Sequence, residues 1–180
     1  MLEHDHLPNF NQVVLPHLGA AYNLARWLLR NDHDAEDVLQ EAVIRALRFF
    51  DGFRGENPRA WLLKVVRNSA YTFLQENRQR ELETGFDEKL HGDPAISGRS
   101  SETPEVSLQR SAQHRLLNEA VEALPVEFRE VFVLREMEGL SYRQIAEMAQ
   151  IPVGTVMSRL SRARRHLQTA IQHEQARGAV

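Results

Sequence analysis

Several absences narrow the kinds of protein that this sequence can encode. The chain has no cysteine, which excludes disulfide bonds and thiolate metal sites and fits the reducing cytoplasm. No apolar run reaches the roughly 18 residues of a membrane helix, so no membrane insertion is expected. The N-terminus, with acids at Glu3 and Asp5, lacks the basic and then apolar order of a signal peptide. At 180 residues, the chain can form one domain or two small ones.

The charged residues are segregated along the chain. The formal net charge of -3 would by itself disfavour nucleic-acid binding. However, residues 32–41 carry five acids and no base, whereas residues 54–80 carry six bases against two acids. Residues 154–173 carry four arginines and no acid. Such blocks of alternating sign indicate several charged surfaces with separate tasks.

The periodicity of the apolar residues predicts an all-α fold. They recur at helical spacing in almost every segment, and no segment alternates like a strand. Between Thr84 and Pro104, glycine, proline and serine residues interrupt any period. We therefore predict a flexible acidic linker over residues 83–108, which joins two small helical domains at residues 1–82 and 109–176.

The second half of the chain predicts a helix-turn-helix. Ser141 is a good cap for a short helix, Tyr142–Ala149, and a longer basic helix begins near Val153 after a tight turn. Gln150 stands in that turn where many such motifs have glycine. A left-handed conformation at this position would cost roughly 1 kcal/mol.

The last helix has an apolar stripe and a polar, arginine-rich remainder. At about 100° per residue, the stripe that faces the core is Val156, Leu160, Ala163, Leu167 and Ile171. Short polar side chains let a helix enter the major groove, and arginine can bond guanine edges or phosphates. An ordinary amphipathic surface helix is the plainer interpretation, but its charge is all arginine and it follows a capped turn. The candidate DNA contacts are Thr155, Ser158, Arg159, Ser161, Arg162, Arg164 and Arg165.

The acidic segment predicts a helix with a protein-docking face. We expect Asp34 to cap this helix. The spacing of its aspartates lacks the glycine and the final glutamate of a calcium-binding loop, so no metal site is predicted. Helix capping and the helix dipole account for the aspartates at the start of the helix. An isoleucine among acids on the outer side indicates docking of a protein. The outer residues are Asp37, Gln40, Glu41, Ile44 and Arg48.

A third candidate surface lies on a long helix that Asn57 and Pro58 are expected to begin, as cap and first residue. Basic side chains interleaved with aromatic and amide side chains suit single-stranded nucleic acid. The cations pair with phosphates, and the aromatic rings stack on unpaired nucleobases. A core tryptophan beside a solvated basic face is the plainer alternative. The candidates here are Arg54, Arg59, Trp61, Lys64, Arg67, Asn68 and Tyr71.

These segments together resemble the extracytoplasmic-function sigma factors over nearly the whole chain. Residues 34–41 (DAEDVLQE) are similar to the segment that docks on the polymerase clamp helices. Residues 58–63 (PRAWLL), with Arg67 and Asn68, are similar to the segment that melts and reads the minus-ten element. Residues 151–156 (IPVGTV), with the arginines after them, are similar to the helix that reads the minus-thirty-five element.

The resemblance implies an all-helical sigma factor that binds core RNA polymerase and promoter DNA. It also implies an inhibitory anti-sigma partner, no cofactor and no catalytic residue. Three residues depart from the family's usual pattern. Thr72 and Phe73 stand where an acid and a base are common, and Met157 stands where a polar or basic residue is common.

Two other classes of protein account for less of the sequence. A two-domain transcription regulator without polymerase binding would share the helix-turn-helix, but it leaves the basic and aromatic helix after Pro58 unexplained. A metal-dependent nuclease would need grouped catalytic residues. The histidines are scattered, and no nucleophile, base and acid are arranged together.

Overall fold

The structure, a computed structural model, describes the backbone of residues 9–54, 57–84 and 104–177. No strand occurs in these three ranges, and the predicted all-α fold is confirmed. The chain divides into two compact units, Met1–Leu90 and His91–Val180. Most of the predicted linker, residues 85–103, lies outside the described residues. The helices on either side reach into its two ends, to Thr84 and from Pro104.

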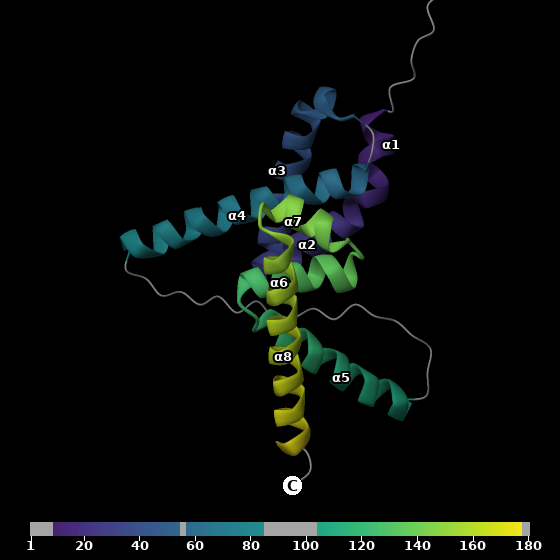
Figure 1. Cartoon of the computed structure of the whole chain (residues 1–180), viewed down its shortest axis with the longest axis vertical. Coiled ribbons are helices and arrows are strands. Elements are labelled where there is room, and N and C mark those ends of the chain that lie inside the picture. Colours follow the sequence, from purple (N-terminus) through teal and green to yellow (C-terminus); the bar gives the residue numbers. More distant parts are fainter. Residues whose placement is uncertain (1–8, 55–56, 85–103, 178–180) are drawn as a thin grey trace, which may run out of the picture. The chain divides into compact units, whose positions relative to one another are not determined.

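The described residues of unit 1 form four α-helices and two short 3-10 turns (Figure 1). In chain order they are α1 (Phe10–Val14), η1 (Leu15–His17), α2 (Leu18–Leu29), α3 (Asp32–Arg48), η2 (Phe50–Gly52) and α4 (Pro58–Thr84). Helices α2, α3 and α4 pack against one another in all three pairings. Their shared core is fully buried and includes Leu24, Leu28, Val38, Leu62, Leu63 and Val66.

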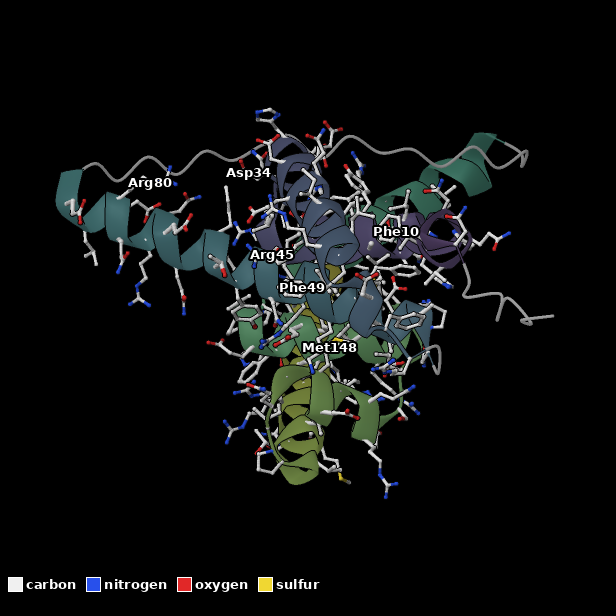
Figure 2. The ribbon with its side chains drawn as sticks, turned by 90° about the horizontal axis from the view of Figure 1, so that it is seen from above. Phe10, Asp34, Arg45, Phe49, Arg80 and Met148 are labelled. Carbon is white, nitrogen blue, oxygen red and sulfur yellow. The ribbon has the colours of Figure 1, made fainter. Side chains whose placement is uncertain are left out.

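Only the first part of α4 belongs to that core. Leu62, Leu63, Val66 and Ala70 are fully buried, whereas residues 78–83 are all exposed. Figure 1 shows the second part of α4 extending beyond α1, α2 and α3. Figure 2 shows Arg80 on this extending part, far from Phe10 of α1.

The cap of α3 is Asn31, so the prediction that Asp34 caps this helix is wrong. The side-chain oxygen of Asn31 accepts a hydrogen bond from the backbone N–H of Asp34 at 3.0 Å. Asp32 forms an ion pair with Arg26 of α2 and accepts a weak bond from the Tyr22 hydroxyl, which ties α2 to α3. Asp34 is instead partly buried in the first turn, and this burial raises the pKa of its carboxyl group.

The predicted start of α4 is confirmed. The side-chain oxygen of Asn57 accepts a hydrogen bond from the backbone N–H of Ala60 at 3.0 Å, and Pro58 is the first helical residue. Proline is favoured there because its missing N–H would have had no partner within the helix.

Unit 2 contains α5 (Pro104–Glu122), α6 (Val126–Phe132), η3 (Val133–Met137), α7 (Tyr142–Ala149) and α8 (Val153–Arg177). Helix α8 packs against α5, α6 and α7 and supplies the centre of the core (Figure 1). The segment η3 is a π-helical continuation of α6, and it ends before Gly139, which has a φ of 69°.

A charged side chain closes one end of this core, which the sequence reading did not anticipate. Arg129 is only 4% exposed, and its Nη1 donates to the carbonyl oxygens of Glu122 at 2.6 Å and Leu124 at 3.0 Å. These carbonyls lie at the C-terminal end of α5, where helical partners are missing. Arg129 therefore fastens the end of α5 to α6.

The helix-turn-helix is confirmed in detail. Ser141 and Gln144 form a reciprocal capping box at the start of α7. Ile145, Ala146 and Met148 are buried, and α8 begins at Val153 as expected. Gln150 adopts the left-handed conformation, with a φ of 56° and a ψ of 46°.

Replacing Gln150 by glycine is expected to stabilise unit 2. Glycine adopts this left-handed conformation without a Cβ clash, so Gln150→Gly should raise the free energy of unfolding by about 1 kcal/mol. Urea unfolding followed by circular dichroism measures the change. Gln113→Gly, at an exposed helical position of α5, is the matched control and should lower the free energy by about 1 kcal/mol. An equal loss in both variants would contradict the prediction.

Candidate nucleic-acid interfaces and protein-docking face

The outer side of α3 is exposed as predicted. Asp37, Gln40, Glu41, Ile44 and Arg48 are all exposed, and Ala35, Val38, Ala42 and Ala46 are buried on the opposite side. Nη2 of Arg45 donates to Oε1 of Glu41 at 2.5 Å one helical turn away. We call the five exposed residues, together with Leu47, the α3 face.

Leu47 belongs to the α3 face, although the sequence reading omitted it. It lies three residues after Ile44 and seven after Gln40, so all three share one side of the helix. Ile44 is 54% exposed and Leu47 is 57% exposed. Phe49, the C-cap residue directly after α3, is 65% exposed. Several large apolar side chains close together and open to solvent are typical of a protein-binding site.

The basic stripe of α4 runs along the side of the helix opposite its core residues. Arg67 and Asn68 lie three and four residues after Lys64, Tyr71 lies four and three residues after them, and Gln75 and Arg78 continue the series. The Arg67 guanidinium lies 4.1 Å from the centre of the Tyr71 ring. This cation-π contact places a positive charge directly beside an aromatic face. We call Lys64, Arg67, Asn68 and Tyr71 the α4 stripe.

Trp61 belongs both to an aromatic cluster and to the edge of the α4 stripe. Its ring centre lies 4.9 Å from that of Phe53 and 6.3 Å from that of Phe50. Phe50 in turn meets Phe10 of α1 edge to face at 5.3 Å. Trp61 remains half-exposed in this cluster. The two interpretations of Trp61, core residue and surface aromatic, are therefore compatible.

The structure does not bring the two remaining basic candidates onto the α4 stripe. Arg54 is exposed in the loop before α4, next to Phe53. Arg59 is half-buried in the first turn of α4, five residues before Lys64. Five residues correspond to about 140° around the helix, so Arg59 points to another side.

On α8 the predicted inner stripe is confirmed, with Val156, Leu160, Ala163 and Leu167 buried and Ile171 half-buried. The candidate DNA contacts cover the other sides. Ser158, Ser161, Arg162, Arg164 and Arg165 are exposed, and Thr155 and Arg159 are half-exposed. The Ser158 hydroxyl donates to the Thr155 carbonyl oxygen at 3.0 Å, so its oxygen can accept a bond from a base.

Arg164 differs from the other arginines of α8 because it is paired within the protein. Its Nη2 donates to Oε1 of Glu136, which lies in η3. The bond to Glu136 raises the pKa of the Arg164 guanidinium. A phosphate would therefore have to compete with Glu136 for this side chain.

The described part of the chain contains no group of three or more histidine, cysteine or acidic residues placed to hold a metal ion. Within the same ranges, no helix is both long and apolar enough to cross a membrane.

Two family models match most of the chain. The model for Sigma-70 region 2 matches residues 13–80, which extend from α1 into α4. The model for Sigma-70, region 4 matches residues 114–167, which include α6, α7 and the first part of α8. The α3 face and α4 stripe thus lie in the first match and the helix-turn-helix in the second.

Curated proteins of similar sequence carry matching names. The chain is 36% identical over 152 residues to the ECF RNA polymerase sigma-E factor of Haemophilus influenzae, an alignment covering 83% of this chain and 79% of the relative. It is 33% identical to the RNA polymerase sigma-H factor of Pseudomonas aeruginosa, with 91% of this chain and 86% of the relative covered.

A solved structure shares the fold. The sigma factor RpoE of Bartonella quintana, in its complex with the anti-sigma factor NepR, matches with a TM-score of 0.68 and 29% identity. The match covers 91% of this chain and 96% of the other.

Proposed function

Because the chain belongs to the extracytoplasmic-function group of the sigma-70 factors, we propose that it binds core RNA polymerase and directs initiation at specific promoters. The observation that carries this proposal is the presence, in one chain, of an exposed docking face and of two helices with basic sides that reach solvent, in the segments that match regions 2 and 4. The protein would act in the cytoplasm, by binding and without catalysis.

The domains predicted from the sequence then receive separate tasks. Residues 1–82 form the region 2 domain, which binds core polymerase and the minus-ten element. Residues 109–176 form the region 4 domain, which binds the minus-thirty-five element. Residues 83–108 connect the two.

The α3 face is the proposed contact with core polymerase. Its acids are exposed around Ile44 and Leu47, so a basic surface with an apolar centre would complement it. Apolar side chains at the centre supply affinity, and surrounding charges supply orientation and specificity.

The α4 stripe is the proposed contact with the opened minus-ten element. Lys64 and Arg67 can neutralise phosphates, and Tyr71 and Trp61 can stack on unpaired bases. Asn68 is exposed and has both a donor and an acceptor for a base edge. Arg54, in the loop before α4, would add a positive charge for the phosphates of the opened DNA strand.

Helix α8 is the proposed reader of the minus-thirty-five element. Ser158, Ser161 and Arg162 point away from its buried stripe and can reach base edges in the major groove. Arg159 and Arg165 are placed nearer the phosphates, although Arg165 can serve either role, and Thr155 lies on the same outer side as Ser158.

An anti-sigma protein is the proposed second partner. The Bartonella quintana sigma factor was solved in complex with the anti-sigma factor NepR, and it covers 91% of this chain at 29% identity. A protein inhibitor would keep this chain from core polymerase until a signal releases it.

The test of this function has two parts. Binding of the full chain to core polymerase, without any promoter, distinguishes a sigma factor from a conventional helix-turn-helix regulator. Transcription with purified core polymerase and a genomic promoter library then identifies the promoters. Absence of core binding would favour the regulator, and core binding without any enriched promoter would contradict promoter-specific initiation.

The promoter library also tests the assignment of arginines on α8. Arg162→Ala should relax base preference at one or two minus-thirty-five positions, because a bidentate arginine–guanine contact is worth about 1–3 kcal/mol of discrimination. Arg159→Ala should weaken all promoters alike, because phosphates carry no sequence information. Sequencing of the promoters that each variant enriches measures both effects. A changed preference with Arg159→Ala alone would mean that α8 is oriented differently in the groove.

A further inference from the structure

The ion pair between Glu136 and Arg164 joins two elements that are distant in sequence. Glu136 lies in η3, and Arg164 lies on the flank of α8, 28 residues later. Both side chains are partly exposed, at 38% for Glu136 and 55% for Arg164. The pair is therefore accessible from solvent, on a helix that also presents Ser161, Arg162 and Arg165.

The cation next to Glu136 in the sequence is bonded to other groups. The adjacent cation, Arg135, donates to the Leu140 carbonyl oxygen at 2.9 Å and lies 4.8 Å from the centre of the Tyr142 ring. Arg135 is thus held by groups on its own side of the turn. The bond to Glu136 also raises the pKa of the Arg164 guanidinium.

An arginine in an ion pair brings no net positive charge to a DNA phosphate. To make a phosphate contact, Arg164 would have to leave Glu136 and expose an uncompensated carboxylate near the DNA. Each phosphate contact contributes about 0.9 to the slope of log affinity against log salt concentration. If Arg164 stays paired with Glu136 and makes no phosphate contact, the slope of log affinity against log salt concentration should lack this contribution.

We propose that Glu136 withholds Arg164 from promoter phosphates and thereby limits the DNA affinity of α8 without changing its base preference. This inference rests on the proposed function, since it requires α8 to meet promoter DNA. Glu136 is a positioning residue here, because it acts through Arg164 and not on the DNA.

The test compares Glu136→Gln with the unchanged chain, each assembled with core polymerase. The probe is the promoter duplex that the unchanged holoenzyme enriches most from the genomic library. Binding is measured as a function of salt, on this duplex and on one with a scrambled minus-thirty-five element. Glu136→Gln should raise affinity roughly three- to tenfold on both and steepen the salt slope by about one unit.

A double-variant comparison identifies the route of the effect. In an Arg164→Ala background, Glu136→Gln should give no further gain in affinity or slope. Glu127→Gln, which neutralises an exposed acid in the first turn of α6, is the matched control and should leave the slope unchanged.

The outcomes separate this inference from the proposed function. An unchanged slope with Glu136→Gln would overturn the inference and leave the function standing. A gain that persists without Arg164 would also overturn it, because the carboxylate would then act by direct repulsion. If the unchanged holoenzyme enriches no promoter, the proposed function fails and the inference with it.

Discussion

A chain that carries Gln40→Ala and Glu41→Lys is expected to bind core RNA polymerase at least about tenfold more weakly while keeping its fold. Both side chains are exposed on the α3 face beside Ile44 and Leu47, so neither supports the core of unit 1. A tenfold loss corresponds to about 1.4 kcal/mol, which is modest for a reversed charge and a lost amide at the centre of an interface. Reversal of Glu41 also breaks its hydrogen bond with Arg45, an exposed pair of small energetic value.

The measurement is the dissociation constant of the full chain with core polymerase, together with a thermal unfolding curve. The matched control is Gln79→Ala with Glu81→Lys, the same two changes at exposed positions on the extending part of α4. The control should bind core polymerase as the unchanged chain does. Equal affinity of the α3 variant and the control, with both folded, would remove the α3 face from the polymerase interface.

Alanine at both Arg67 and Tyr71 is expected to reduce transcription from duplex promoters by tenfold or more, and much less from a template that is already melted. The guanidinium lies 4.1 Å from the ring centre, so the two side chains form one unit with a cation and an aromatic face. Stacking of an unpaired base on an aromatic side chain is worth about 1–3 kcal/mol. If the pair captures bases as they open, its loss should matter most when opening is the slow step.

The measurement compares initial rates on duplex and pre-melted versions of one promoter. Arg80→Ala is the matched control, because it removes a positive charge from the same helix at an exposed position on the side away from the α4 stripe. Arg80→Ala should change the initial rate of transcription only slightly on either template. An equal loss on the two templates with the Arg67 and Tyr71 variant would exclude a role in strand opening and would indicate binding alone.

The helix-turn-helix could be predicted from the sequence because its signals are local. Ser141 and Gln144 cap α7 through bonds that span three residues, and the turn at Gln150 is governed by backbone sterics of a single residue. The buried stripe of α8 follows from the helical period alone. The capping residue of α3 was harder to predict from the sequence, because Asn31 and Asp34 are both suited to cap a helix and stand only three residues apart.

What the sequence determined by itself was therefore four of the helices, α3, α4, α7 and α8, together with the buried stripe of α8 and the outward-facing sides of α3, α4 and α8. Tertiary structure decided the partners of charged side chains. Arg164 meets Glu136 across 28 residues, and Arg129 reaches the end of α5 from inside the core. No helical or strand period relates such residues, because their proximity depends on how whole helices pack. The sequence could show that Arg164 lies on a flank of α8, but only the tertiary fold, which brings Glu136 of η3 to this side chain, shows which acid holds it.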